Sequence, residues 1–147
     1  MKRVLSIFFV LSFSYSVCKS QSWIRTDSLH TKQLNLSRYD SALYFAEETA
    51  AIVRGLEGEN TINYAKTLNN LAVSHFYLGN FKKAKFFVLK EIVLLETLKA
   101  TNNANYICVL ENASIICRKC GNHEESLDWI KKTEKHALRI YGFSKIE

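Results

Sequence analysis

The sequence predicts an all-α fold in which pairs of helices stack into a solenoid. The first observation is an internal repeat, because the sequence pattern of residues 64–84 recurs at residues 106–126. The residues that match between the two copies are Tyr64 and Tyr106, Leu68 and Leu110, Asn70 and Asn112, Gly79 and Gly121, and Asn80 and Asn122. The second is that apolar residues recur every three or four positions on both sides of the two glycines, while proline is absent. The two copies are 42 residues apart, and a repeat of this length built from helical patterns indicates stacked helix pairs. Such a stack presents a surface to other molecules.

Residues 1–20 have the three parts of a secretory signal peptide. Lys2 and Arg3 precede an uncharged, mostly apolar run at 4–17, and small residues follow this run. The run is shorter than the roughly 20 apolar residues that a membrane-spanning helix needs. A buried core helix is the alternative interpretation. We therefore expect an exported protein, located in the periplasm, in the cell envelope or outside the cell, with no stable membrane span after signal removal.

Two cleavage sites fit the signal, one before Gln21 and one before Lys19. Lipidation of Cys18 ranks below plain cleavage, because the residue before it, Val17, is branched. Removal of residues 1–20 lowers the formal net charge from +6 to +3. This small net positive charge does not indicate a nucleic-acid partner. The remaining length, about 127 residues, is that of one domain with its own core.

The first unit is expected to cover about residues 22–58. Its first helix, near 22–36, carries many polar residues, whereas its second helix has a clear apolar stripe. The members of this stripe are Tyr39, Ala42, Leu43, Phe45, Ala46, Thr49, Ala50 and Ile52. A first repeat that differs from the others is expected, because one of its flanks faces water instead of a neighbour.

The second and third units are expected to cover about residues 62–101 and 104–142. Gly79 and Gly121 each end one apolar segment and precede another, which is the position of a helix C-terminal cap. The stretches 60–61 and 101–103 supply caps and loops between the units. One charged residue, Glu91, interrupts the apolar stripe of its helix, and we expect it at the edge of that stripe.

The final helix is expected near residues 124–141, followed by a tail or the start of a linker at 143–147. The side chains predicted to face back into the stack are Leu127, Ile130, Ala137 and Leu138. Two large side chains, Trp129 and Ile140, have no later repeat to cover them. Exposed apolar groups at the end of a solenoid call for a cap or a partner. We therefore expect self-association through the last repeat, or fraying there.

Residues 64–84 closely resemble a tetratricopeptide repeat (TPR), and the longer form found in kinesin light chains and bacterial scaffold proteins is the better match. The family's small residue at the helix crossing corresponds to Ala72 and Ser114, and its turn glycine corresponds to Gly79, Gly121 and Ser37. The aromatic residue after the turn corresponds to Tyr39 and Phe81, and the second alanine corresponds to Ala42 and Ala84. His123 and Ser126 depart from this pattern, so the third unit is the most divergent. The resemblance covers nearly all of residues 22–142 and implies that residues 21–142 form a right-handed superhelical solenoid of about three antiparallel helix pairs.

The resemblance also implies a concave groove, lined by the first helix of each unit, that binds a protein or peptide partner. The residues expected to line it are Lys66, Asn69, Asn70, Val73, Tyr77, Glu111, Asn112, Ile115 and Lys119. Asn70 and Asn112 occupy equivalent places, and an amide with donors and an acceptor suits the backbone of an extended peptide. Lys66 would pair with a carboxylate of the partner, as in the carboxylate-binding groove of the family. The family's groove has a second cation, but this chain has Cys108 at that place. The alternative is that both asparagines serve packing between repeats.

Catalytic and metal-binding patterns are weak in this sequence. Cys117, Cys120 and His123 lie close together, but the next candidate ligand, His136, lies about 20 Å further along one helix. Cys117 falls on the apolar stripe and is expected to be a packed thiol. The lone histidines, His30 among them, are expected at the surface or packed in the core. With no nucleophile and base at a recognisable spacing and no phosphate loop, we expect no enzyme and no cofactor.

The sequence thus predicts a non-enzymatic scaffold for protein–protein interactions. The alternative is the sensory or scaffolding N-terminal part of a larger bacterial signalling protein. In proteins that the chain resembles, such repeats precede a caspase-like peptidase, a histidine kinase or a transcription regulator. A redox or metal role for Cys117 and Cys120 is a third interpretation.

Overall fold

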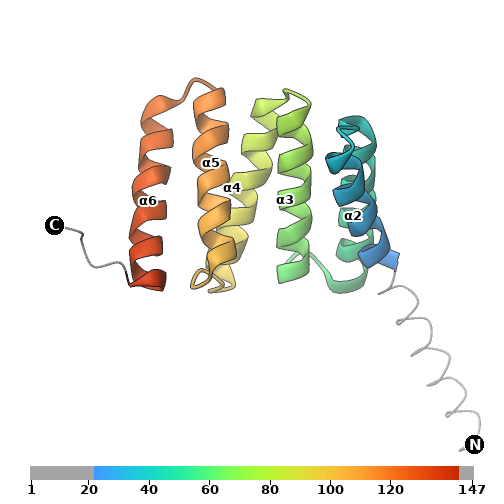
Figure 1. Ribbon diagram of the computed structural model, residues 1–147. Coiled ribbons are helices and arrows are strands. Elements are labelled where there is room, and N and C mark those ends of the chain that lie inside the picture. The colour runs from blue at the N-terminus through green and yellow to red at the C-terminus, as the bar shows by residue number, and fades with distance from the viewer. Residues whose placement is uncertain (1–21, 143–147) are drawn as a thin grey trace, which may run out of the picture.

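The computed structural model describes residues 22–142, which form six helices and no strand (Figure 1). The first helix spans residues 22–35, and the others are α2 (Tyr39–Glu57), α3 (Ile62–Tyr77), α4 (Phe81–Thr97), α5 (Ala104–Lys119) and α6 (His123–Tyr141). Consecutive helices pack against one another in a row. The predicted all-α, right-handed solenoid of three antiparallel helix pairs is confirmed. The expected signal peptide, 1–20, and the tail, 143–147, lie outside the described residues.

The same tight turn follows the first helix of every pair. Ser37, Gly79 and Gly121 occupy equivalent positions in the three repeats and have φ angles of 56°, 75° and 81°. After α3, the Gly79 N–H donates to the carbonyl of Phe76, and the next N–H donates to the carbonyl of His75. This pairing satisfies carbonyls at the helix end and needs a left-handed residue, which is why glycine is favoured there. The predicted C-terminal caps at the two glycines are confirmed.

The first helices of the second and third pairs begin with equivalent caps. The side chain of Thr61 accepts a hydrogen bond from the backbone N–H of Tyr64 at 3.1 Å. Asn103, at the equivalent position of the third repeat, accepts from the N–H of Tyr106 at 3.0 Å. Each cap satisfies one of the free N–H groups at a helix start, and it fixes where the helix begins.

The central core lies between α3, α4 and α5. Its buried members are Ala65, Ala72, Ala84, Val88, Ile92, Leu95, Tyr106, Val109, Leu110, Ala113 and Ile116. The Tyr106 hydroxyl donates to Glu96 of α4 at 2.7 Å, and Lys132 of α6 donates to the same carboxylate oxygen. The bond from Lys132 and then the bond from Tyr106 lower the pKa of Glu96, while desolvation opposes them. None of the helices in residues 22–142 is long and apolar enough to cross a membrane.

The orientation predicted for α6 is wrong. Leu127, Ile130 and Leu138 do not face back into the stack, because they are 56%, 50% and 45% exposed. Trp129, which the sequence placed at an uncovered end, packs instead against the central core. Ala137 and Ile140 are both half-buried.

The reason is that α6 carries two stripes of residues at helical spacing, one position apart. The stripe that begins with Ser126 and Trp129 faces α5, where the Ser126 hydroxyl donates to the Ser114 carbonyl at 2.8 Å. The stripe of Leu127, Ile130 and Leu138 is where a following helix would pack, as α5 packs on α4. In the described residues no helix follows α6 to cover this stripe.

Candidate functional site

Two adjoining hollows open on the groove face, which we define as the face formed by the first helix of each pair. The polar hollow has a volume of about 270 Å³, and its lining residues are Asp27, Lys66, Asn69, Asn70, Glu91, Asn105, Cys108, Val109 and Asn112. The apolar hollow has a volume of about 180 Å³, and its lining residues are Val73, Phe76, Tyr77, Asn112, Ile115 and Ile116. Asn112 lines both hollows, so polar and apolar binding surfaces are continuous along α3 and α5.

Most of the residues expected in the groove line these two hollows. Lys66, Asn69, Asn70 and Asn112 lie at the polar hollow, and Asn112 also borders the apolar one, which holds Val73, Tyr77 and Ile115. The Tyr77 ring is exposed and stacks on that of Tyr39 of α2, with ring centroids 4.9 Å apart. Repeat spacing and helical period together therefore bring residues from two repeats to one surface.

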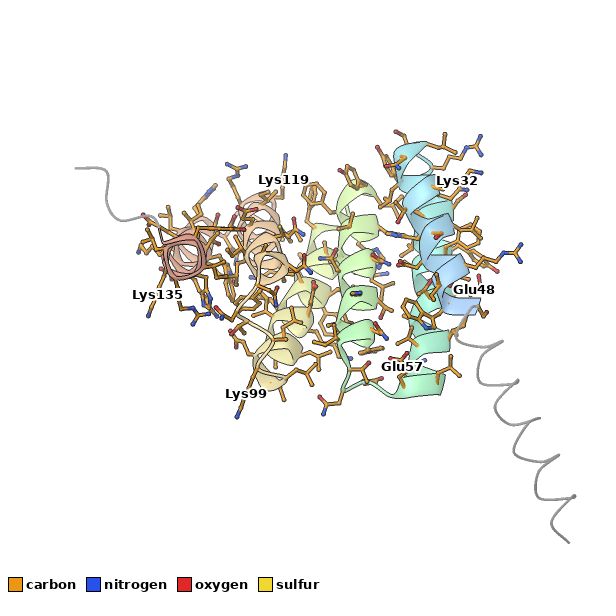
Figure 2. All side chains as sticks on the ribbon, turned by 60° about the horizontal axis from the view of Figure 1, so that its bottom comes forward. Lys32, Glu48, Glu57, Lys99, Lys119 and Lys135 are labelled. Atoms are coloured by element: carbon orange, nitrogen blue, oxygen red, sulfur yellow. The ribbon has the colours of Figure 1, made fainter. Side chains whose placement is uncertain are left out.

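The other two expected residues, Glu111 and Lys119, line neither hollow. Both side chains are exposed. Figure 2 shows Lys119 and Lys32 along the upper edge of the row of helices, with Lys99 along the lower edge. Lys119 lines a separate hollow with Lys82, beside the turn that precedes α4.

The amide of Asn70 is engaged within the protein. Its Nδ2 donates to Oδ1 of Asp27, on the first helix, at 2.6 Å. This bond joins the first repeat to the second, so packing between repeats is one role of Asn70. Asn112 is half-buried, and its amide makes no hydrogen bond within residues 22–142. The two equivalent asparagines thus differ, and Asn112 is the one whose donors and acceptor are unengaged at the hollows.

Glu91 lies on the floor of the polar hollow, although the sequence placed it at the edge of the apolar stripe of its helix. That expectation is wrong, because Glu91 is only 3% exposed. Its Oε2 accepts a hydrogen bond from Nδ2 of Asn69 at 3.1 Å. Burial raises the pKa of Glu91 to about 8, and the bond from Asn69 opposes this rise. The carboxyl group is therefore largely protonated at neutral pH.

Sequence reasoning did not assign Asp27, Glu91 or Asn105 to the groove. The signal for Asp27 was present, because it is the first-repeat equivalent of Asn69. The polar first helix concealed this equivalence. Glu91 had no such signal, because it reaches the hollow from α4, the second helix of its pair.

Beneath the groove face, polar bonds fasten the first helix to its neighbours. His30 Nε2 and the Ser74 hydroxyl are 3.0 Å apart, and the two residues are 3% and 0% exposed. The Thr49 and Thr26 hydroxyl oxygens are 2.7 Å apart and form a hydrogen bond between α2 and the first helix. A serine beside a histidine can pair a nucleophile with a base, but Ser74 is fully buried, so a substrate could not reach its hydroxyl. The sequence allowed a surface or a packed histidine at position 30, and His30 is packed.

The cysteines of the described residues are free thiols. Cys117 is buried, as its place on the apolar stripe predicted, and burial raises the pKa of its thiol to about 11. Cys120 is half-buried and Cys108 is exposed. Across residues 22–142 no group of three His, Cys, Asp or Glu side chains is placed to hold a metal ion.

No protein-family model and no curated protein matches the sequence. Among solved structures, the fold is similar to the crystal structure of BtubC (BKLC) from P. vanneervenii, a kinesin light chain-like TPR protein. The TM-score is 0.76 at 14% sequence identity, and the match covers 85% of this chain and 50% of that one. The chain thus spans about half the length of BtubC. The likeness shows the fold alone, which is a TPR-like helical repeat.

Proposed function

We propose that this chain is a non-enzymatic scaffold that holds a peptide or protein segment along its groove face. The observation that carries the proposal is the pair of adjoining hollows, one polar and one apolar, lined by residues of the first helix, α3 and α5 and by Glu91 of α4. An extended peptide needs donors and acceptors for its backbone and apolar surface for its side chains. Asn112, at the boundary of the hollows, supplies the first, and Ile115 supplies the second.

The test is selection of random displayed peptides on the purified protein. Peptides that bind the groove face should lose affinity on Asn112→Ala, by about 1 kcal/mol for one lost hydrogen bond. Ile115→Ala should weaken the same peptides. Val93→Ala is the control, because Val93 is exposed on α4 and lines neither hollow. Selected peptides that respond to Val93→Ala and not to Asn112→Ala would contradict a binding site on the groove face.

Asn70→Ala is a separate measurement, because Asn70 also bonds Asp27. Its removal should lower stability as well as binding, by about 1 kcal/mol for the lost bond. If thermal melting is unchanged in Asn70→Ala while peptide binding falls, Asn70 serves the ligand and not the packing of repeats.

We also propose that the chain is exported. The support is the order of basic residues, apolar run and small residues in 1–20. Amino-terminal sequencing of protein from the cell envelope should then find a chain that begins at Gln21 or Lys19. An intact Met1 on protein from the cytoplasm would contradict export.

Self-association through the last repeat is a further part of the proposal. Its support is the apolar edge, which we define as Leu127, Ile130 and Leu138 on α6. These side chains lie together on the last helix of the described stack, and apolar groups that gather on one surface favour a partner.

A further inference from the structure

Position 91 differs in kind from its equivalents in the other two repeats. The equivalent residues are Thr49 in the first repeat and Thr133 in the third. Each threonine hydroxyl donates to a carbonyl of its own helix, Thr49 to that of Phe45 at 2.7 Å and Thr133 to that of Trp129 at 2.8 Å, and Thr49 also bonds Thr26 of the first helix. The repeat therefore packs well with a small residue at this place. An acid here is not required by the fold.

The acid is also unfavourable where it stands. Glu91 is only 3% exposed, and none of the ion pairs within residues 22–142 includes it. Its hydrogen-bond partner in this part of the chain is the neutral amide of Asn69. A buried carboxyl without a cation either stays protonated or waits for a partner. Such a titratable group in a hollow is a candidate for a binding role.

The surroundings of Glu91 show which partner would suit it. Asp27 of the first helix supplies a second carboxylate, and Asn112 of α5 supplies an amide oxygen. The other titratable groups that line the hollow are Lys66 of α3 and Cys108 of α5, both exposed at its rim. The lining of the hollow thus includes two carboxylates and an amide oxygen as acceptors, and one of them, Oδ1 of Asp27, already accepts from Asn70. A guanidinium group, with five N–H donors in a plane and no acceptor, complements such a set.

We propose that the polar hollow binds an arginine side chain of the partner peptide, with Glu91 as the carboxylate that pairs with the guanidinium. This rests on the proposed groove function and adds the chemistry of one ligand residue to it. On binding, the Glu91 carboxyl releases its proton to solvent, and its oxygens accept N–H bonds from the guanidinium. Asn69 continues to donate to Oε2 and holds the carboxylate toward the hollow.

The experiment uses two small probes, N-acetyl-arginine N-methylamide and the citrulline analogue, which has the same shape without the charge. Titration followed by NMR should shift the side-chain amides of Asn69 and Asn112 with the arginine amide only. Calorimetry in two buffers at pH 7 should show release of roughly one proton per bound arginine amide. Between pH 6.5 and 7.5 the affinity should rise about tenfold, since Glu91 must ionise to bind. Equal binding of the two probes would overturn the proposal.

Two variants separate a lost site from a lost fold. Glu91→Gln should weaken arginine-amide binding by about tenfold or more, and Glu91→Thr should abolish the proton release. Glu91→Thr is expected to fold, because Thr49 and Thr133 occupy the equivalent positions. Glu134→Gln makes the same chemical change at an exposed site on α6 and should leave binding unchanged. A Glu91→Thr variant that folds and binds the arginine amide like wild type would overturn the proposal.

Peptides selected on the groove face distinguish this proposal from the function beneath it. If peptides bind through Asn112 but tolerate replacement of every arginine by citrulline, the groove function stands and the arginine site is contradicted. If the arginine amide binds through Glu91 while no peptide depends on Asn112, the site stands and the groove function is contradicted.

Discussion

Ser37 is the residue at which the first repeat departs from the turn chemistry of the other two. The equivalent positions hold Gly79 and Gly121, and all three adopt positive φ angles. For a residue with a side chain this left-handed conformation costs about 1–2 kcal/mol. The hydrogen bonds from Ser37 and Arg38 to the end of the first helix hold the strained conformation in place.

Ser37→Gly should therefore stabilise the fold. We expect a gain of about 0.5–1 kcal/mol, since relief of strain exceeds the extra entropy of glycine in the unfolded chain. The free energy of unfolding, measured in urea, checks this. Ser37→Ala is the control, because it keeps the Cβ atom and should bring no gain. A glycine variant no more stable than the alanine variant would show that the turn is unstrained.

His30 links pH to the attachment of the first helix. Burial lowers the pKa of this histidine, while the charge of Asp27 acts in the opposite direction. A histidine whose pKa is lower in the folded state favours folding only while neutral. Its contribution is thus fully present above pH 6.5, the unfolded value, and is lost as the pH falls through the lower folded value. Burial also lowers the pKa values of His75 and His136, so they act in the same direction.

His30→Gln should make stability less dependent on pH in the acid range. Glutamine can still bond Ser74 but takes up no proton, so the slope below pH 6.5 should fall by up to about 1.4 kcal/mol per pH unit. Urea unfolding at pH 5 and pH 7 provides the measurement. His123→Gln is the matched control, since His123 is exposed at the start of α6. An equal change in slope in both variants would contradict the assignment to His30.

At the scale of helices, the turns and caps could be predicted from the sequence, but the face that a helix packs against its neighbour could not. The turns at Gly79 and Gly121 and the cap at Thr61 depend on a few neighbouring residues, so the sequence was enough to find them. The groove residues of α3 and α5 were expected from the resemblance to the tetratricopeptide repeat, which implies that the first helix of each unit lines the groove. The inward face of α6 could not be predicted, because two stripes of similar period compete and only packing against α5 selects one. Glu91 was misplaced for a similar reason, since periodicity cannot show that an acid is buried beneath a hollow.

The packing of α6 predicts unequal local stability within the third repeat. Ser126 is the one buried residue of α6, whereas α5 has eight, Tyr106 and Leu110 among them. Few buried contacts mean low local stability. Hydrogen exchange should therefore be fastest in α6 among the helices from α2 onward and slowest in α3 and α5, which each have eight buried residues. Uniform protection from α3 to α6 would show that the last helix is held as firmly as the rest.

The whole molecule is a row of helices in which each inner helix buries one flank on its predecessor and one on its successor. Val88 of α4 is fully buried because α5 covers it, while Ile130, its equivalent in the third repeat, is 50% exposed. The same position is thus core in one repeat and surface in the next. The surface that would self-associate is therefore the apolar edge, which includes Ile130, and not the indole of Trp129. Replacement of Trp129 by lysine would damage the core that it packs against.

Ile130→Lys should weaken self-association without unfolding the protein. In a symmetric dimer both copies lose an apolar contact and gain a buried charge, so the dimer should be weakened by at least about tenfold. Sedimentation equilibrium over a range of concentrations measures this. Val93→Lys is the matched control, because Val93 is 62% exposed on α4, away from the apolar edge. Wild-type protein that stays monomeric at high concentration would exclude a second copy as the occupant of the apolar edge. The edge would then fit the alternative in which the helix pairs form part of a larger protein, with α6 covered by a further helix.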